Sequence, residues 1–448
     1  MNTLAWASLR HRPTAFVATF LAVLLGTAMI GSFATLLETA GGPVSTADEE
    51  TLTIMGAVVG GWGSAIVLFS VASTLAVTVR QRETEVGLLR AIGATPRQAR
   101  RLIRAEALLV TVLAAIGGAL VAAVGGRALL ALLRSGDLVS AEIAYGGGPA
   151  SLAAAACLVV ATATVAAAVT ARRATRGPAT VVLRESGIDT GRMRWWRVAA
   201  GVVLVGYGLA MAAVTITVTA DSEDPYAAMQ TAGASSILVG VGLALFAPVL
   251  LRLMSAPART ALGRSASGHL ASYNVARRSH LLASVLAPVI VLTSSAIGTL
   301  MLVGIDGRTL EGTVEGAETI NLLNNVVVGM IALFAAIMVV NAIAAAISHR
   351  RSELRRLWLV GATPAEVERS VVTEAAIVAA VGVLVGAVAS LATIMPFAIA
   401  RDEGPVPDGQ LWLPPLLVVG VVALTLTAAR GAVRPALRQA VHAGATGR

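Results

Sequence analysis

Two stretches of the chain share one pattern, RQRETEVGLLRAIGATPRQARRLIRAEA from Arg80 to Ala107 and RRSELRRLWLVGATPAEVERSVVTEA from Arg350 to Ala375. They align without a gap when Arg82 is set on Arg350, which is an offset of 268 residues. Self-similarity at a fixed spacing indicates a duplicated structural unit. One local fold is therefore expected twice in this chain.

Each of these two loops predicts a helix, a sharp stop and a second helix. A glycine, Gly93 or Gly361, can adopt the left-handed conformation that ends a helix. The threonine two residues later, Thr95 or Thr363, suits an N-cap, and the proline that follows it suits the first turn. A Gln or Glu three residues after each threonine completes a capping box.

The first helix of each loop carries an apolar stripe on an otherwise charged segment. Its members are Val86, Leu89 and Ile92 in the first loop and Leu354, Leu357 and Val360 in the second. Such a stripe needs a partner, which is the lipid headgroup region, the protein's own spans or another protein. Its repetition favours a docking element, and a duplicated element suits a partner that is itself a dimer.

Outside these loops the chain is strongly apolar, with 56% hydrophobic and only 13% charged residues. These values exclude a soluble globular protein of 448 residues, which needs a charged surface around each domain. Ten stretches without charge are each long enough to cross a bilayer as a helix. They are Pro13–Leu37, Thr51–Val79, Ala107–Gly126, Ile143–Ala171, Val198–Ala220, Pro225–Leu251, Ser279–Ile305, Thr319–His349, Ala375–Ala400 and Gly409–Ala429.

The expected fold class is an all-α polytopic membrane protein with ten transmembrane helices. Residues 4–12 resemble residues 270–278, so the repeat extends upstream of the loops. Six spans separate equivalent points, which predicts two parallel four-helix repeats joined by two extra spans. The expected parts are a first unit at 1–178, a linker with spans five and six at 179–262, and a second unit at 263–448.

The basic residues predict the orientation. All 34 are arginine, and only Arg127, Arg134, Arg308 and Arg401 fall on one side of the expected spans. The positive-inside rule therefore places both termini in the cytoplasm. The outer loops hold at most about 13 residues, too few for a folded domain.

Several functions are excluded by missing side chains. Without lysine the chain lacks the residue that a Walker A loop places on the phosphates, so no ordinary ATP site and no enzyme activity is expected. Basic loops are usual in membrane proteins, so no nucleic-acid partner is expected. The five histidines are scattered, and nothing in the sequence suggests a metal site.

The repeated loops resemble the permease subunits of FtsX-like, macrolide-exporter-type ABC transporters. The corresponding positions are Arg82, Glu85, Leu89, Arg90, Gly93, Ala94 and Thr95 in the first loop, and Arg350, Glu353, Leu357, Trp358, Gly361, Ala362 and Thr363 in the second. The second loop departs from the pattern at Trp358, where the first has Arg90. Ten spans with two such units are similar to the bacitracin-exporter-like branch, without its large extracellular domain.

The resemblance implies that each loop is a coupling helix, at Glu83 to Ile92 and at Arg351 to Val360. In the family, this helix lies in a groove of a separate cytoplasmic ATPase subunit, and two such subunits bind ATP and Mg. By the same resemblance, the positions above would contact the ATPase dimer. Their acids would pair with basic groups, and Leu89 and Leu357 would be the apolar anchors. The expected location is a bacterial cell membrane.

The small outer loops favour a substrate taken from the membrane, namely a lipid or an amphipathic peptide or drug, and membrane lipid is an expected partner. Two alternatives remain open, a secondary transporter with parallel repeats and a non-transporting mechanotransmission or signalling subunit. The lack of acids inside the spans disfavours proton coupling. Asn324, Asn325 and Asn341 are candidates for a substrate path, or for hydrogen bonds between helices.

Overall fold

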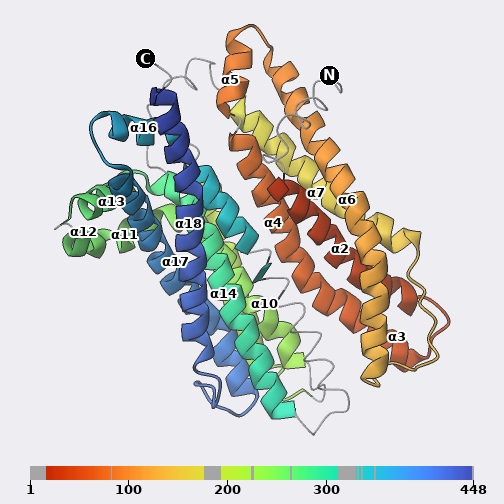
Figure 1. The fold of residues 1–448 in the computed structure, drawn as a ribbon. Helices are drawn as coiled ribbons and strands as arrows, with labels where there is room; N and C mark the ends of the chain where they lie inside the picture. Colours follow the sequence, from red (N-terminus) through yellow and green to blue (C-terminus); the bar gives the residue numbers. More distant parts are fainter. Residues whose placement is uncertain are drawn as a thin grey trace. The chain divides into compact units, whose positions relative to one another are not determined.

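The structure is a computed structural model, and it describes residues 17–81, 83–175, 193–222, 227–262, 265–310, 329, 332–333, 336–347 and 350–445. Every regular element within these ranges is a helix, as Figure 1 shows. The expected all-α fold class of a polytopic membrane protein is therefore confirmed.

The chain divides into two compact units, each described here by itself. Unit 1 comprises Met1–Gly187 and Leu310–Ile337, and unit 2 comprises Ile188–Thr309 and Met338–Arg448. The helices of unit 1 are α2 (Val17–Ala40), α3 (Thr46–Thr53), the π-helix η2 (Ile54–Val59), α4 (Gly60–Gln81), α5 (Glu83–Ala91), α6 (Pro96–Ser135) and α7 (Pro149–Ala174). This division differs from the three parts drawn from the sequence, which remain a prediction.

Unit 2 contains long helices of its own and a group of short helices near one of their ends (Figure 1). They are α9 (Trp195–Thr217), α10 (Ala227–Leu245), α11 (Ala247–Met254), α12 (Ala256–Leu262), α13 (Ala266–Arg277), α14 (Ser279–Leu310), α16 (Arg351–Leu359), α17 (Pro364–Ala400) and α18 (Leu413–Ala445). A short apolar helix, Ala336–Ile347, precedes α16.

Eight helices in the described part of the chain are long and apolar enough to cross a membrane. They coincide with eight of the ten expected spans. The second expected span is helical as η2 and α4, while most of the eighth lies outside the described residues. The ten-span arrangement therefore remains a prediction.

Glycines bring the long helices of unit 1 into close contact. A methyl group on Gly118 of α6 would lie only 2.4 Å from the carbonyl oxygen of Leu24 and 2.7 Å from Cβ of Thr27, both on α2. Small residues permit such backbone approach, on which helix association in lipid depends. The close contact between α2 and α6 therefore depends on Gly118 having no side chain.

The same contact recurs in unit 2. A methyl group on Gly386 of α17 would lie 2.9 Å from the carbonyl oxygen of Ile290 and 2.5 Å from Cβ of Thr293, both on α14. Gly386 follows Gly118 by the offset of the repeated loops, and Ile290 and Thr293 follow Leu24 and Thr27 by the offset of the upstream match. Equivalent residues thus make equivalent contacts in the two units.

Polar side chains hold the loops at the far ends of these helices. In unit 1 the Glu38 carboxylate accepts hydrogen bonds from the backbone N–H groups of Gly148 (2.9 Å) and Ser151 (3.0 Å), at the start of α7. In unit 2 the Arg308 guanidinium donates to both carboxylate oxygens of Glu403, at 3.1 and 3.0 Å. In both units the loop after the long central helix is tied back to the helix that the glycine contacts.

We expect Gly118→Ala and Gly386→Ala each to destabilise the protein by about 1–3 kcal/mol, because the added methyl group meets backbone and must push two helices apart. Gly420→Ala on α18 is the matched control, since nothing lies within 4 Å of a methyl group there. Thermal unfolding in detergent measures the difference. Equal melting temperatures for all three variants would contradict this account of helix packing.

Candidate functional site

The two repeated loops have the same backbone geometry. Helix α5 ends at Ala91 and α16 at Leu359, and each is followed by a glycine with positive φ, +107° at Gly93 and +104° at Gly361. The N–H of the next residue, Ala94 or Ala362, donates to the carbonyl five residues earlier at 3.0 Å. This is the Schellman arrangement, which satisfies carbonyls at a helix end and stops the helix sharply.

The second helix of each loop begins with a capping box. The Thr95 N–H donates to the Gln98 side chain at 2.8 Å, and the Gln98 N–H donates to the Thr95 hydroxyl at 3.3 Å. Thr363 and Glu366 make the same two bonds at 2.8 and 3.3 Å. Both predicted caps are therefore present, and each turn is held from its two sides.

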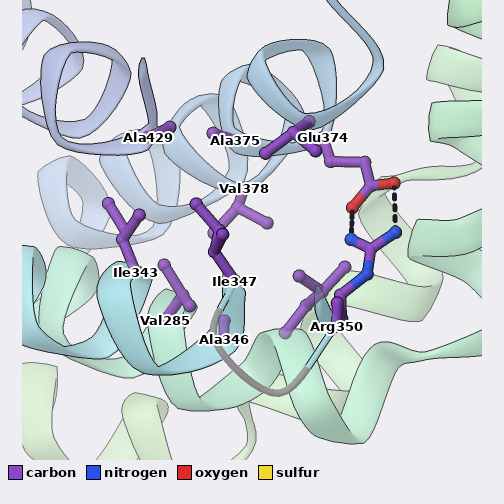
Figure 2. A pocket seen from close by; sticks show the side chains of 11 residues that line it. Val285, Ile343, Ala346, Ile347, Arg350, Glu374, Ala375, Val378 and Ala429 are labelled. Atoms are coloured by element: carbon purple, nitrogen blue, oxygen red, sulfur yellow. Dashed lines mark hydrogen bonds and ion pairs between the residues drawn. The ribbon is translucent and has the colours of Figure 1, made fainter. Parts of the chain in front are cut away.

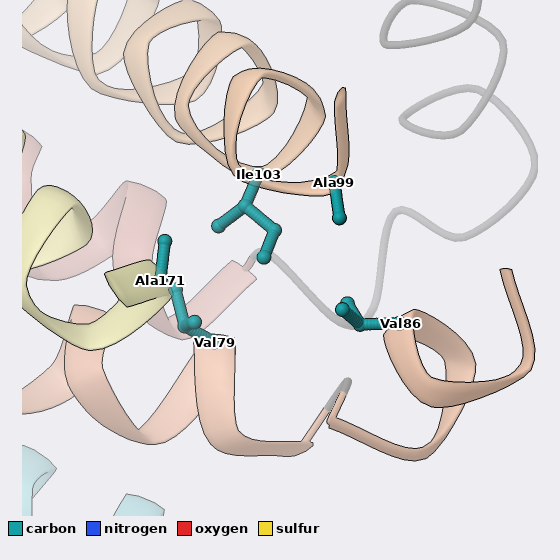
Figure 3. Close-up of a cluster of buried hydrophobic side chains, with 5 residues drawn as sticks. All are labelled: Val79, Val86, Ala99, Ile103 and Ala171. Carbon is teal, nitrogen blue, oxygen red and sulfur yellow. The ribbon is translucent and has the colours of Figure 1, made fainter. Parts of the chain in front are cut away.

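One end of the apolar stripe packs inside the protein. In the first loop Val86 is 5% exposed and lies in a cluster with Val79 of α4, Ala99 and Ile103 of α6, and Ala171 of α7, as Figure 3 shows. The second loop buries the equivalent residues, which are Leu354, Ile347, Val367 and Val371. Burial of Val86 thereby stabilises the packing of α5 against its own helix bundle, and burial of Leu354 does the same for α16.

The other end of the stripe faces outward. Ile92 is 83% exposed and Val360 is 89% exposed, and each directly precedes the positive-φ glycine. Leu89 is 36% exposed, while Leu357 is half-buried. The expected anchors Leu89 and Leu357 thus lie between a buried and an exposed position, and the most exposed apolar residue of each loop is at its tip.

The second loop contains a buried cluster of charges. The guanidinium of Arg350, which is 6% exposed, forms an ion pair with both carboxylate oxygens of Glu374 on α17 (Figure 2). The same guanidinium contacts the Glu353 carboxylate at 3.2 Å, and Arg278 pairs with that carboxylate from the end of α13. Asn274 of α13 donates to Glu374 at 2.7 Å.

The charges of this cluster stabilise one another. Burial disfavours the charged form of Arg350, but attraction and hydrogen bonds from Glu374 and Glu353 raise its pKa above the usual range. Burial would raise the pKa of Glu353, but the hydrogen bond from Arg278 and the charge of Arg350 lower it below the ordinary value. Removing one member of a buried pair typically costs about 3–5 kcal/mol, because a charge is left without a partner.

The first loop has an equivalent buried acid. Glu106 of α6 is 2% exposed, as Glu374 is, and it occupies the corresponding position in the alignment. The aligned arginine, Arg82, lies outside the described residues. The alignment of the two loops pairs Glu106 with Glu374, but their spacing alone predicts no role for them. The sequence signal for this buried acid is its identity in both repeats, at the start of an apolar span.

The other predicted positions are distributed as follows. Glu85, Arg90 and Trp358 are half-buried. Asn324 and Asn325, the other two candidates for a substrate path, lie outside the described residues. The Asn341 side-chain nitrogen is buried and has no hydrogen-bond partner among the described residues.

Within the described part of the chain, no group of His, Cys, Asp and Glu could hold a metal ion. Both loops instead combine a capped turn with an exposed apolar tip, and the second loop adds an internal ion-pair cluster. Such an arrangement can bind a partner and transmit its movement, because the contact residue is firmly joined to a long helix.

We expect Gly93→Ala and Gly361→Ala to destabilise each turn by about 1 kcal/mol or more, because a Cβ is strained at positive φ even where space is open. Gly431→Ala on α18 is the control, since it also has open space but no positive φ. Hydrogen exchange of α5 and α16 measures the effect. Unchanged protection in both turn variants would refute it.

We expect acid to weaken the attachment of α16. The pKa of Glu353 is lowered in the folded protein, so its stabilising contribution is present above the unfolded value of about 4.3 and is lost as the pH falls through the lower, folded value. The melting temperature of Glu353→Gln should therefore vary less with pH below about 4 than that of the unchanged protein. Parallel pH profiles would argue against this role for the carboxylate.

A family model described as the FtsX-like permease C-terminal region matches the chain twice, over residues 57–179 and 325–439. Together the two matches cover more than half of the sequence, and each contains one of the repeated loops. No curated protein matches the chain.

Proposed function

Because the chain belongs to the FtsX-like permease family and is the membrane permease of an ABC-type system, we propose that a separate ATPase dimer moves it by docking on α5 and α16. The observation that carries this proposal is the pair of exposed apolar tips, Ile92 and Val360. They occupy equivalent positions, each between a short helix and a capped turn that leads into a long helix.

The fully buried core of a protein interface is more apolar than its rim, so an exposed apolar side chain is suited to be covered by a soluble partner. One such residue would be unremarkable, since isolated exposed apolar residues are common on protein surfaces. Two residues at the same point of a repeated turn support a duplicated docking surface, which a dimeric partner matches. In this proposal ATP and Mg bind the partner, since the chain has no lysine for a Walker A loop.

The proposed cargo is a hydrophobic or amphipathic molecule, such as a lipid, a peptide or a drug, that is exported or extracted from a bacterial cell membrane. Support comes from the outer loops, which are short and bound closely to the helix ends. They leave little material for a separate domain that would capture a soluble substrate. Both termini lie in the cytoplasm in this proposal, following the distribution of arginine.

The test is a pull-down of the ATPase by the detergent-solubilised chain. We expect Ile92→Glu and Val360→Glu each to weaken binding at least about tenfold, because a charge would have to be buried in an apolar interface, and the double variant to abolish it. Val406→Glu is the matched control, since Val406 is 62% exposed in the loop at the other end of α17. Leu89→Glu and Leu357→Glu test the anchors expected from the sequence.

Three outcomes would separate the alternatives. If the double variant binds as well as the unchanged chain, the tips are not the docking surface. If no ATPase binds, a secondary transporter with parallel repeats becomes the better explanation. If the ATPase binds but its activity ignores every hydrophobic candidate tested, a mechanotransmission or signalling subunit without transport is favoured.

A further inference from the structure

A polar cluster joins three elements of unit 2 beside the proposed docking helix. It consists of Asn274 and Arg278 from the end of α13, Arg350 and Glu353 from the start of α16, and Glu374 from α17. None of these contacts is needed for α16 to present an apolar tip to a partner. The cluster therefore calls for a role other than docking.

Arg350 is the centre of the cluster. It immediately precedes α16 and reaches α17 through Glu374, while Glu353 lies one turn into α16. Glu353 in turn holds Arg278, and Glu374 holds the Asn274 amide at 2.7 Å. Through these bonds α16 is fixed to two helices, the short helix α13 and the long helix α17.

The surroundings make this attachment stiff. Figure 2 shows Arg350 and Glu374 at the wall of a small cavity of about 30 Å³, lined otherwise by apolar residues such as Val285, Ile343 and Val378. An apolar wall provides no other hydrogen-bond partner for a guanidinium or a carboxylate. Moving Arg350 away from Glu374 would leave the buried Glu374 carboxylate with only the neutral Asn274 amide and Arg350 with only Glu353, whereas rotating the three helices together keeps every bond.

We propose that Arg350 is a positioning residue that makes α16, α13 and α17 move as one body, so that displacement of α16 moves the membrane span instead of bending the loop. This inference rests on the proposed function, because it assumes that a partner displaces α16. Without the cluster, α16 would be held to α17 by the turn at Gly361 and by packing of Leu354. Those contacts fix where α16 begins and ends more firmly than its angle to the span.

The first repeat contains the sequence for an equivalent joint. Glu106 is buried at the position of Glu374, and Arg82 and Glu85 align with Arg350 and Glu353. Arg12 aligns with Arg278 at the upstream offset.

The test measures the distance between α16 and α17 with two spin labels. Cys157→Ser removes the only cysteine, and labels at Arg356 and Leu384 occupy exposed positions outside the cluster and the tip. Distances are recorded for the chain with its ATPase, without nucleotide and with ATP and vanadate. We expect one narrow distribution in both states, and in Arg350→Met a distribution roughly twice as wide that shifts with nucleotide.

Controls separate positioning from folding. Arg434→Met removes an exposed ion pair with Glu368 at 3.3 Å and should leave the distribution narrow. Glu374→Asp keeps a carboxylate at this position and should retain most of the narrow distance distribution. Glu374→Gln removes the charge and should widen the distribution. If Arg350→Met does not fold, Glu374→Gln replaces it, because Arg350 then keeps Glu353 as a partner.

The outcomes also separate this proposal from the proposed function. If Arg350→Met binds the ATPase and keeps the narrow, nucleotide-independent distribution, the positioning role is wrong. If no ATPase binds the unchanged chain, docking fails, and the same labels are compared in the chain alone. A wider distribution for Arg350→Met then still supports the joint, and an unchanged one overturns it.

Discussion

The cost of placing charge in an apolar interior governs this molecule. Its long helices are almost free of charge, so they associate through close contacts such as Gly118 with Leu24 and Gly386 with Ile290. Charged residues gather toward the helix ends, and buried ones there have polar or charged partners, as Glu374 has Arg350 and Asp48 has Ser45 and Ser140. The ends of the helices therefore carry the polar bonds, and the middle carries the packing.

The two repeats share a framework but differ in the surface they expose. The bounds of α5 and α16, the starts of α6 and α17, the positive-φ glycines, the capping boxes and the buried apolar residues of the loops correspond position by position. The exposed residues are less alike, because Leu88 of the first loop corresponds to Arg356 of the second, and Ala91 to Leu359. The backbone geometry is thus common to both loops, whereas the chemistry offered to a partner is particular to each.

Local features of the loops were predictable from the sequence, and contacts between distant segments were not. The caps at Thr95 and Thr363 depend on residues three positions apart, so the starts of α6 and α17 were predicted correctly. The apolar stripe could not show which of its members faces the bundle, because its spacing is the same from Val86 to Ile92. The bond from Asn274 to Glu374 spans 100 residues and depends on how α13 packs against α17.

Fusing two repeats into one polypeptide has a genetic consequence. A dimer of identical subunits receives every mutation twice, but here Gly93 can change while Gly361 stays as it was. A single mutation therefore alters one of the two loops and leaves the other unchanged within the same molecule. Whether the altered loop or the unaltered loop determines the behaviour of the whole molecule can then be observed with one gene copy.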